Sequence, residues 1–217
     1  DISAQKNSVV QVHADKSSGY GVACGGPQNL PDRIVTALHV VAGKKTIIVK
    51  WQGKTSYATI EKIYKPSDLA LLRLQTPLRL PALALYSGEP PWDTNINFWE
   101  IPINTTSVSA KTTVLEERTS LSKLSPRVAD NPTGLSKSPC AGQYYPGMTT
   151  EVINFKEPNI RKAHSGSPLT YGDKILGLVD GGAKLIDGKA CASAIPASPC
   201  TKLFNQGTPI PAGMQPC

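Results

Sequence analysis

Polar and apolar positions alternate over short stretches of this chain, and turn residues separate the stretches. Residues 8–13 alternate valines with polar neighbours, which is typical of a half-buried strand, and Leu-Ala-Leu-Leu-Arg-Leu at 69–74 predicts a buried one. Gln-Gly-Lys at 52–54 predicts a hairpin turn. The strands that we expect are residues 8–13, 20–24, 33–37, 46–51, 56–64 and 69–74 in the first half, and 95–103, 108–115, 151–155, 167–171, 174–179 and 189–195 in the second.

These patterns predict an all-β protein, and the abundance of turn residues, 18 glycines and 19 prolines, agrees with that class. We interpret the proline-rich residues 81–92 as a connection between an N-terminal unit, residues 1–80, and a C-terminal unit, residues 93–217. Residues 116–146 show little periodicity and are long for a loop, so they either serve a function or contain an unrecognised strand. Only residues 199–204 predict a helix, a short one near the C-terminus.

The basic charge of the chain is scattered. The net charge is +7, but the densest basic groups, residues 44–45 and 161–162, are too short to form a stripe that binds nucleic acid, and aromatic residues make up only 6%. We therefore expect no nucleic-acid partner. We also expect no membrane span, because no apolar run approaches the required length of about 20 residues.

Five cysteines, Cys24, Cys140, Cys191, Cys200 and Cys217, lack the spacing of a metal site. Up to two disulfides and one free thiol would suit an oxidising compartment. The pairing stays open: Cys191 with Cys200, or Cys200 with Cys217, would close short loops. We expect Cys24, in an apolar strand, to be a buried small side chain.

Three stretches carry residue types suited to catalysis. Ser165 stands in His-Ser-Gly-Ser-Pro, where Gly166 permits a sharp turn that would expose the serine hydroxyl. His39 ends an apolar strand and can take up and return a proton near neutral pH. Asp68 opens an apolar strand, where a buried carboxylate needs a partner. Each also has a plainer interpretation, respectively a polar β-turn, a histidine bonded to a backbone carbonyl, and a turn residue that initiates a strand.

Together, the three residues meet the needs of hydrolysis by serine. That chemistry requires a nucleophile, an imidazole base beside it, and a carboxylate that holds the imidazole in the correct tautomer. The chain order is His39, Asp68, Ser165, with the first two in the N-terminal half and the serine in the C-terminal half.

The motifs around these residues resemble those of the chymotrypsin-like (trypsin-fold) serine proteases. Thr-Ala-Leu-His at 36–39 resembles the family's Thr/Ser-Ala-Ala-His, and Ser-Asp-Leu-Ala-Leu-Leu at 67–72 resembles its Asp-Ile/Leu-Ala-Leu-Leu. Ala-His-Ser-Gly-Ser-Pro at 163–168 resembles its Gly-Asp-Ser-Gly-Gly-Pro. The resemblance spans about residues 8–197 and implies two six-stranded antiparallel β-barrels with the active site in the cleft between them.

The resemblance also implies a role for each site residue. Ser165 would be the nucleophile, His39 the general base and then the acid, and Asp68 the group that orients His39. The backbone N–H groups of Ser165 and Ala163 would bind the oxyanion. No metal or cofactor is expected.

Three departures from the family pattern bear on these roles. Val40 replaces the cysteine that usually follows the histidine, so Cys24 loses its expected disulfide partner. Ala163 replaces the glycine of the oxyanion hole, and because alanine disfavours positive φ, we expect the hole to be distorted or flipped without substrate. His164 replaces the aspartate that pairs with a new N-terminus in zymogen-activated members, so we expect a structural role for it and no such activation.

The primary specificity pocket is predicted only by counting along the chain. Asn159 would lie near its base, whereas Asp180, Gly181 and Gly182 would lie on its wall, after a segment at 175–179 that is similar to the family's cleft-lining strand. A carboxylate on that wall would favour a cationic substrate side chain.

We therefore predict a serine endopeptidase that acts on polypeptides and is secreted or periplasmic, since its short His-to-Asp spacing resembles bacterial members. The main alternative is a catalytically latent or inactive protease-like protein that binds a polyanion or a protein partner. Ala163, His164 and the basic surface motivate that alternative. An esterase with the same triad is a third possibility.

Overall fold

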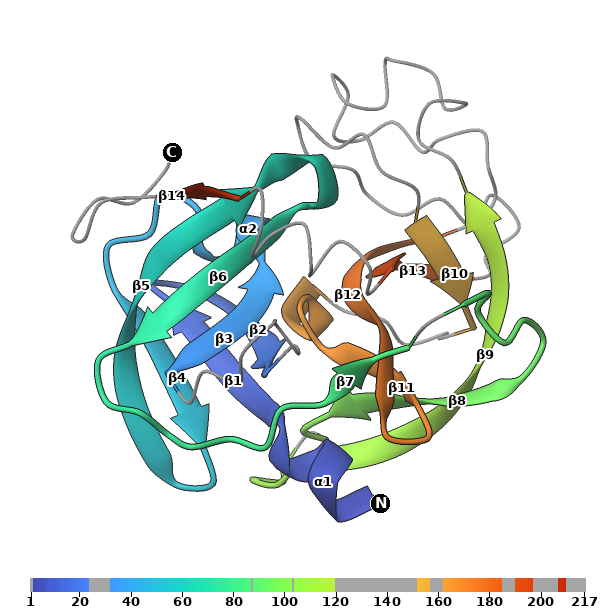
Figure 1. Cartoon of the computed structure of the whole chain (residues 1–217), viewed down its shortest axis with the longest axis horizontal. Helices are drawn as coiled ribbons and strands as arrows, with labels where there is room; N and C mark the ends of the chain where they lie inside the picture. Colours follow the sequence, from blue (N-terminus) through green and yellow to red (C-terminus); the bar gives the residue numbers. More distant parts are fainter. Residues whose placement is uncertain are drawn as a thin grey trace.

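The structure, a computed structural model, describes residues 2–23, 32–86, 88–102, 104–119, 152–156, 162–184, 190–196 and 207–209. Three predicted features lie outside these residues: the helix at 199–204, Asn159, and most of the segment at 116–146. The side chains of all five cysteines also lie outside them. Two sheets, each of seven strands, make up most of what is described (Figure 1), so the predicted all-β class is confirmed.

The first sheet closes on itself. Its strand order is β14-β5-β4-β1-β2-β3-β6, and β5 also pairs with β6, so six strands form a barrel with β14 added at its edge. Alternation along the first strand places Val10 and Val12 in the core, and Gln52 and Gly53 form the predicted hairpin turn with φ values of +48° and +77°. The strands are β1 (Val9–Ala14), β2 (Ser17–Val22), β3 (Arg33–Ala37), β4 (Ile47–Trp51), β5 (Lys54–Tyr64), β6 (Leu69–Leu74) and β14 (Thr208–Pro209).

The second sheet has the strand order β11-β8-β9-β10-β13-β12-β7, and β11 also pairs with β12. Phe98 and Phe155 pack in its core with ring centroids 5.9 Å apart. A complete second barrel, like the C-terminal helix, stays a prediction. The strands are β7 (Ala84–Leu85), β8 (Asn95–Glu100), β9 (Ser109–Thr119), β10 (Val152–Phe155), β11 (Pro168–Tyr171), β12 (Lys174–Lys184) and β13 (Ala190–Pro196).

Short helical turns occur where the sequence predicted none. The structure has α1 (Ile2–Asn7), α2 (Leu38–Val41), and two 3₁₀ turns, η1 (Lys65–Ser67) and η3 (Lys162–His164). His39 therefore lies in a helical turn that follows β3, and its expected place at the end of a strand was wrong. An apolar run such as Leu-His-Val-Val fits a buried strand and a buried helical turn equally well. Among the described residues, no helix has the length and apolar character needed to cross a membrane.

The two sheets are joined by hydrogen bonds close to the candidate site. The N–H of Tyr20 on β2 donates to the carbonyl of Ser165 at 2.8 Å, and the Tyr20 hydroxyl accepts from the N–H of Ile101 at 2.9 Å. Part of the predicted connection is itself a strand, because β7 pairs with β12 in parallel. These contacts hold the turn that carries Ser165 against the first sheet.

Candidate active site

His39 and Asp68 are fixed to each other through their backbones. The N–H of Leu38 donates to the carbonyl of Asp68 at 2.7 Å, and the N–H of His39 donates to Asp68 Oδ1 at 3.0 Å. Asp68 caps η1 in the left-handed conformation, with φ of +52°, which aspartate tolerates better than most residues. The start of α2 and the end of η1 therefore act as one unit that sets the position of the imidazole.

Ser165 follows η3 in a tight turn that both sheets hold. Gly166, the next residue, has φ of +87°, and its N–H donates to the carbonyl of Val179 on β12 at 2.7 Å. A Cβ at Gly166 would lie 1.9 Å from the carbonyl oxygen of Tyr20. Only glycine fits this close approach of two backbones, so the residue predicted to make the sharp turn does make it.

The fold brings the three predicted residues together. His39 Nε2 lies 2.8 Å from Ser165 Oγ, and His39 Nδ1 lies 2.5 Å from Asp68 Oδ2. The Asp68 side chain is 2% exposed and that of His39 is 16% exposed, so water reaches the imidazole but not the carboxylate behind it. With Asp68 accepting the Nδ1 proton, Nε2 is left to accept the hydroxyl proton of Ser165, which is the arrangement that activates a serine nucleophile.

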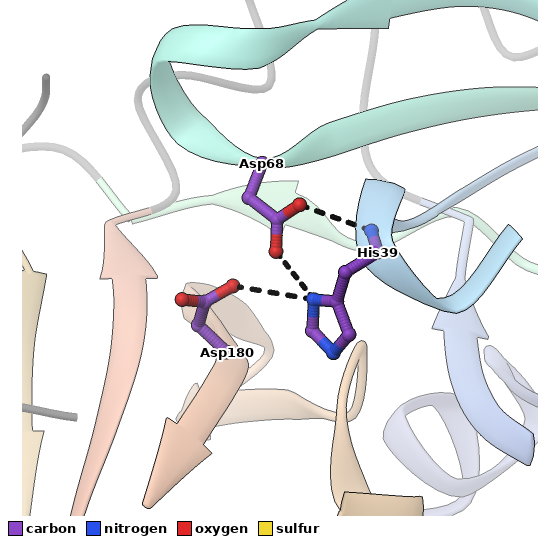
Figure 2. A group of neighbouring side chains, drawn as sticks. All are labelled: His39, Asp68 and Asp180. Atoms are coloured by element: carbon purple, nitrogen blue, oxygen red, sulfur yellow. Dashed lines mark hydrogen bonds and ion pairs between the residues drawn. The ribbon is translucent and has the colours of Figure 1, made fainter. Parts of the chain in front are cut away.

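Asp180 does not lie where counting along the chain predicted. Its side chain is fully buried and points at the imidazole, with Oδ1 3.9 Å from His39 Nδ1 (Figure 2). A carboxylate without exposed surface has no contact with a substrate side chain. The prediction that the Asp180 carboxylate lies on the pocket wall is therefore corrected. Burial first, and then the neighbouring Asp68 carboxylate, raise the pKa of Asp180 well above its usual value.

The position of Asp180 beside His39 was not predicted, although the sequence carries one signal of it. An acidic residue that directly follows the apolar segment 175–179 needs a buried partner, by the same reasoning that singled out Asp68. The ligand-type atoms of His39, Asp68 and Asp180 all lie within 4.8 Å of one another. Since Nδ1 and Asp68 already bond each other, we interpret the group as a hydrogen-bonded pair with a buried acid beside it and not as a metal centre.

Two further predicted residues are described only in part. Gly181 and Gly182 lie on β12, where they pair with Ser193 and Ala192 of β13. Asn159 lies outside the described residues. The assignment of these three residues to a specificity pocket stays a prediction.

The trypsin family model matches residues 2–202 of this chain. The chain belongs to the trypsin family. Among solved structures, the active form of the Rv3671c protease from M. tuberculosis is 21% identical, with a TM-score of 0.74, and the match covers 100% of this chain and 86% of that one. The protease domain of MamO from Magnetospirillum magneticum is 17% identical, with a TM-score of 0.63 and coverage of 91% and 96%.

A serine endoprotease from Yersinia pestis is 17% identical, with a TM-score of 0.65, and the match covers 95% of this chain and 66% of that one. These identities show a shared fold. A search of curated proteins found no match to this chain.

In this trypsin-family protein, a contact between His164 and Glu100 anchors the turn that carries Ser165. His164 Nε2 lies 2.8 Å from Glu100 Oε2, and the His164 side chain is 3% exposed. The His164 ring also packs edge-on against Phe98, with ring centroids 5.0 Å apart. His164 therefore ties η3 to the end of β8, and its structural role stays a prediction.

Ala163 precedes this anchor in the 3₁₀ turn and is not among the residues with positive φ. A 3₁₀ turn directs N–H groups back to carbonyls three residues earlier, so the Ser165 N–H is directed into the turn. The expected distortion of the oxyanion hole stays a prediction.

Replacing Glu100 with glutamine should reduce turnover more than substrate binding. The substitution removes the carboxylate that holds His164, so we expect kcat to fall about 10-fold, with a smaller change in KM. Glu61→Gln is a matched control, because it removes a carboxylate that binds Arg33 Nε at 2.6 Å on the first sheet. Steady-state kinetics measure both variants. An equal fall in kcat in the two would contradict the anchoring role.

Proposed function

We propose that this protein is a serine endopeptidase that hydrolyses peptide bonds through an acyl-enzyme intermediate. The observation that carries the proposal is the contact of 2.8 Å between His39 Nε2 and Ser165 Oγ, with Asp68 bonded to the far side of the ring. Membership of the trypsin family supports a protease with polypeptide substrates.

In the proposed reaction, Ser165 Oγ attacks the carbonyl carbon of the scissile bond while His39 Nε2 takes up the hydroxyl proton. Asp68 keeps the other ring nitrogen protonated and stabilises the imidazolium that forms. His39 then gives the proton to the leaving amine, and the C–N bond breaks to leave the acyl group on Ser165. A water molecule, deprotonated by His39, attacks the acyl group, and the serine hydroxyl is restored.

The oxyanion of each tetrahedral intermediate would be bound by the N–H groups of Ser165 and Ala163. We propose that η3 reorganises when substrate binds, since its 3₁₀ conformation directs the Ser165 N–H back into the turn. The contact between Glu100 and His164 would hold the rest of the turn during this change.

A fluorophosphonate probe tests the proposal directly. The folded protein should be labelled at neutral pH, and peptide mapping should place the label on Ser165, because only an activated serine attacks the phosphorus rapidly. Heat-denatured protein, which keeps the serine but loses the imidazole beside it, should stay unlabelled. A folded protein that resists the probe would favour the latent binding protein, and turnover of simple esters but not of peptides would favour the esterase.

Three further expectations belong with this proposal. We propose that the second sheet completes a six-stranded barrel, so that residues 1–80 and 93–217 form two units joined by 81–92. We propose a specificity pocket built from Asn159, Gly181 and Gly182. The number of cysteines supports a secreted or periplasmic location, where disulfides are stable.

A further inference from the structure

Asp180 is a buried acid for which the proposed reaction has no use. Its side chain is fully buried, and within the described part of the chain no donor reaches either of its carboxyl oxygens. A buried carboxylate without donors is costly, since it gives up water and gains nothing in return. The negatively charged form of Asp180 is therefore unfavourable in this site.

The neighbouring Asp68 has the opposite environment. Its two oxygens accept from the backbone N–H and the ring Nδ1 of His39, so its negative charge is stabilised by two donors. The two carboxyl groups lie within 4.8 Å of each other and of Nδ1 (Figure 2). Two carboxyl groups that are so close and shielded from water hold one proton between them, because two negative charges would repel each other. The proton lies on Asp180, because Asp68 is the group whose charge is stabilised by donors.

We propose that Asp180 is a positioning residue of the triad, whose protonated carboxyl group donates a hydrogen bond to the Asp68 carboxylate and so holds that carboxylate against His39. The inference rests on the proposed serine protease function. The same residue contacts the other end of the triad, because its backbone carbonyl lies 3.2 Å from Ser165 Oγ. Asp180 therefore links Asp68 and Ser165 through one residue of β12.

Within the described residues, the titratable groups that face Asp180 belong to the triad. From α2 it faces His39, and from the end of η1 it faces Asp68. On η3, His164 is bound to Glu100, and on β3, Arg33 is bound to Glu61. On β13, the neighbours of β12 at this point are Ala194 and Ser193, which carry no charge. The proton on Asp180 is therefore controlled by burial and by the triad itself.

The Asn and Leu variants of Asp180 separate a donor from a space-filling side chain. Asp180→Leu has nearly the same shape and no donor, so we expect kcat to fall about 10- to 100-fold with little change in KM. Asp180→Asn keeps an N–H donor toward Asp68 and should recover most of that loss. Equal kcat values in the two variants would overturn the proposal.

The kcat/KM–pH profile reports the charge of Asp180. If Asp180 is neutral, the Asn variant should keep the acid limb of the profile within about 0.3 pH units of the wild type. If Asp180 were ionised, the Asn variant would remove a negative charge 3.9 Å from the imidazole and shift the acid limb down by about one unit or more. That shift would overturn the proposal.

Stability supplies a readout that does not depend on activity. Because the pKa of Asp180 is raised well above its ordinary value, the folded protein keeps a proton that the unfolded chain loses. The contribution of Asp180 to the free energy of unfolding should therefore fall as pH rises from about 4 to about 7. The Asp180→Asn variant has no such proton, so its advantage in urea midpoint over the wild type should grow over this range. A constant difference would contradict a protonated Asp180.

The experiments distinguish a wrong protease function from a wrong role of Asp180. If the wild type is not labelled by fluorophosphonate but the urea midpoints diverge with pH, the protease function is wrong and the protonated acid remains. If the wild type is labelled but the Asn and Leu variants have the same kcat, Asp180 does not position the triad. Should Asp180→Leu fail to fold, Asp180→Ala replaces it as the variant without a donor.

Discussion

Replacing Ser165 with alanine is expected to lower kcat on a peptide substrate by about 10⁶-fold. The substitution removes the Oγ atom that lies 2.8 Å from His39 Nε2, so no nucleophile remains for the imidazole to activate. The fold should persist, because the carbonyl of Ser165 still accepts from Tyr20 and the N–H of Gly166 still donates to Val179. The measurement is kcat with an active-site titration of the wild type, together with circular dichroism of both proteins.

The variants His39→Ala and Ser165→Ala should not be additive. A serine without its base and a base without its serine are both inactive, so the double variant should lose about as much as either single one. Ser107→Ala, which changes an exposed serine, is the matched control and should keep full activity. Substantial turnover by His39→Ala would show that Ser165 does not depend on the imidazole, contrary to the proposed mechanism.

Replacing Gly166 with alanine should destabilise the protein by more than about 4 kcal/mol, beyond the range of most substitutions. The residue has φ of +87°, and the new Cβ would lie 1.9 Å from the carbonyl oxygen of Tyr20 and 2.9 Å from Thr36 Oγ1. Neither neighbour can move freely, because the Tyr20 carbonyl also accepts from the Thr36 hydroxyl at 2.8 Å. Urea unfolding measures the loss.

Gly53→Ala separates backbone strain from this collision. Gly53 has φ of +77°, but a Cβ there would meet nothing within 4 Å. We expect that variant to lose only about 1–2 kcal/mol, the cost of a left-handed backbone for alanine. Equal losses at Gly53 and Gly166 would mean that the close approach between the two sheets is not what selects glycine at position 166.

Much of the fold was predictable because short-range patterns determine it. The alternation along β1 and the apolar run of β6 follow from which faces of each strand are buried, and the hairpin at Gln52 and Gly53 joins the neighbouring strands β4 and β5. The helical turn at His39 was missed because apolar residues on every side hide the difference between a strand and a helix. The C-terminal part of β9 was missed as well, since its residues up to Thr119 show no clear period.

The sequence by itself determined the residue types of the site and the turns that carry them: a serine before a glycine, a histidine after a buried strand, and an aspartate before another. The tertiary structure decided what faces them. The pairing of β12 with β13 shifts register between Val179 and Gly181, and a shift of one residue turns a side chain to the other face of a strand. Counting along the chain therefore could not tell whether Asp180 meets the substrate or the triad, and only the packed sheets turn it toward His39.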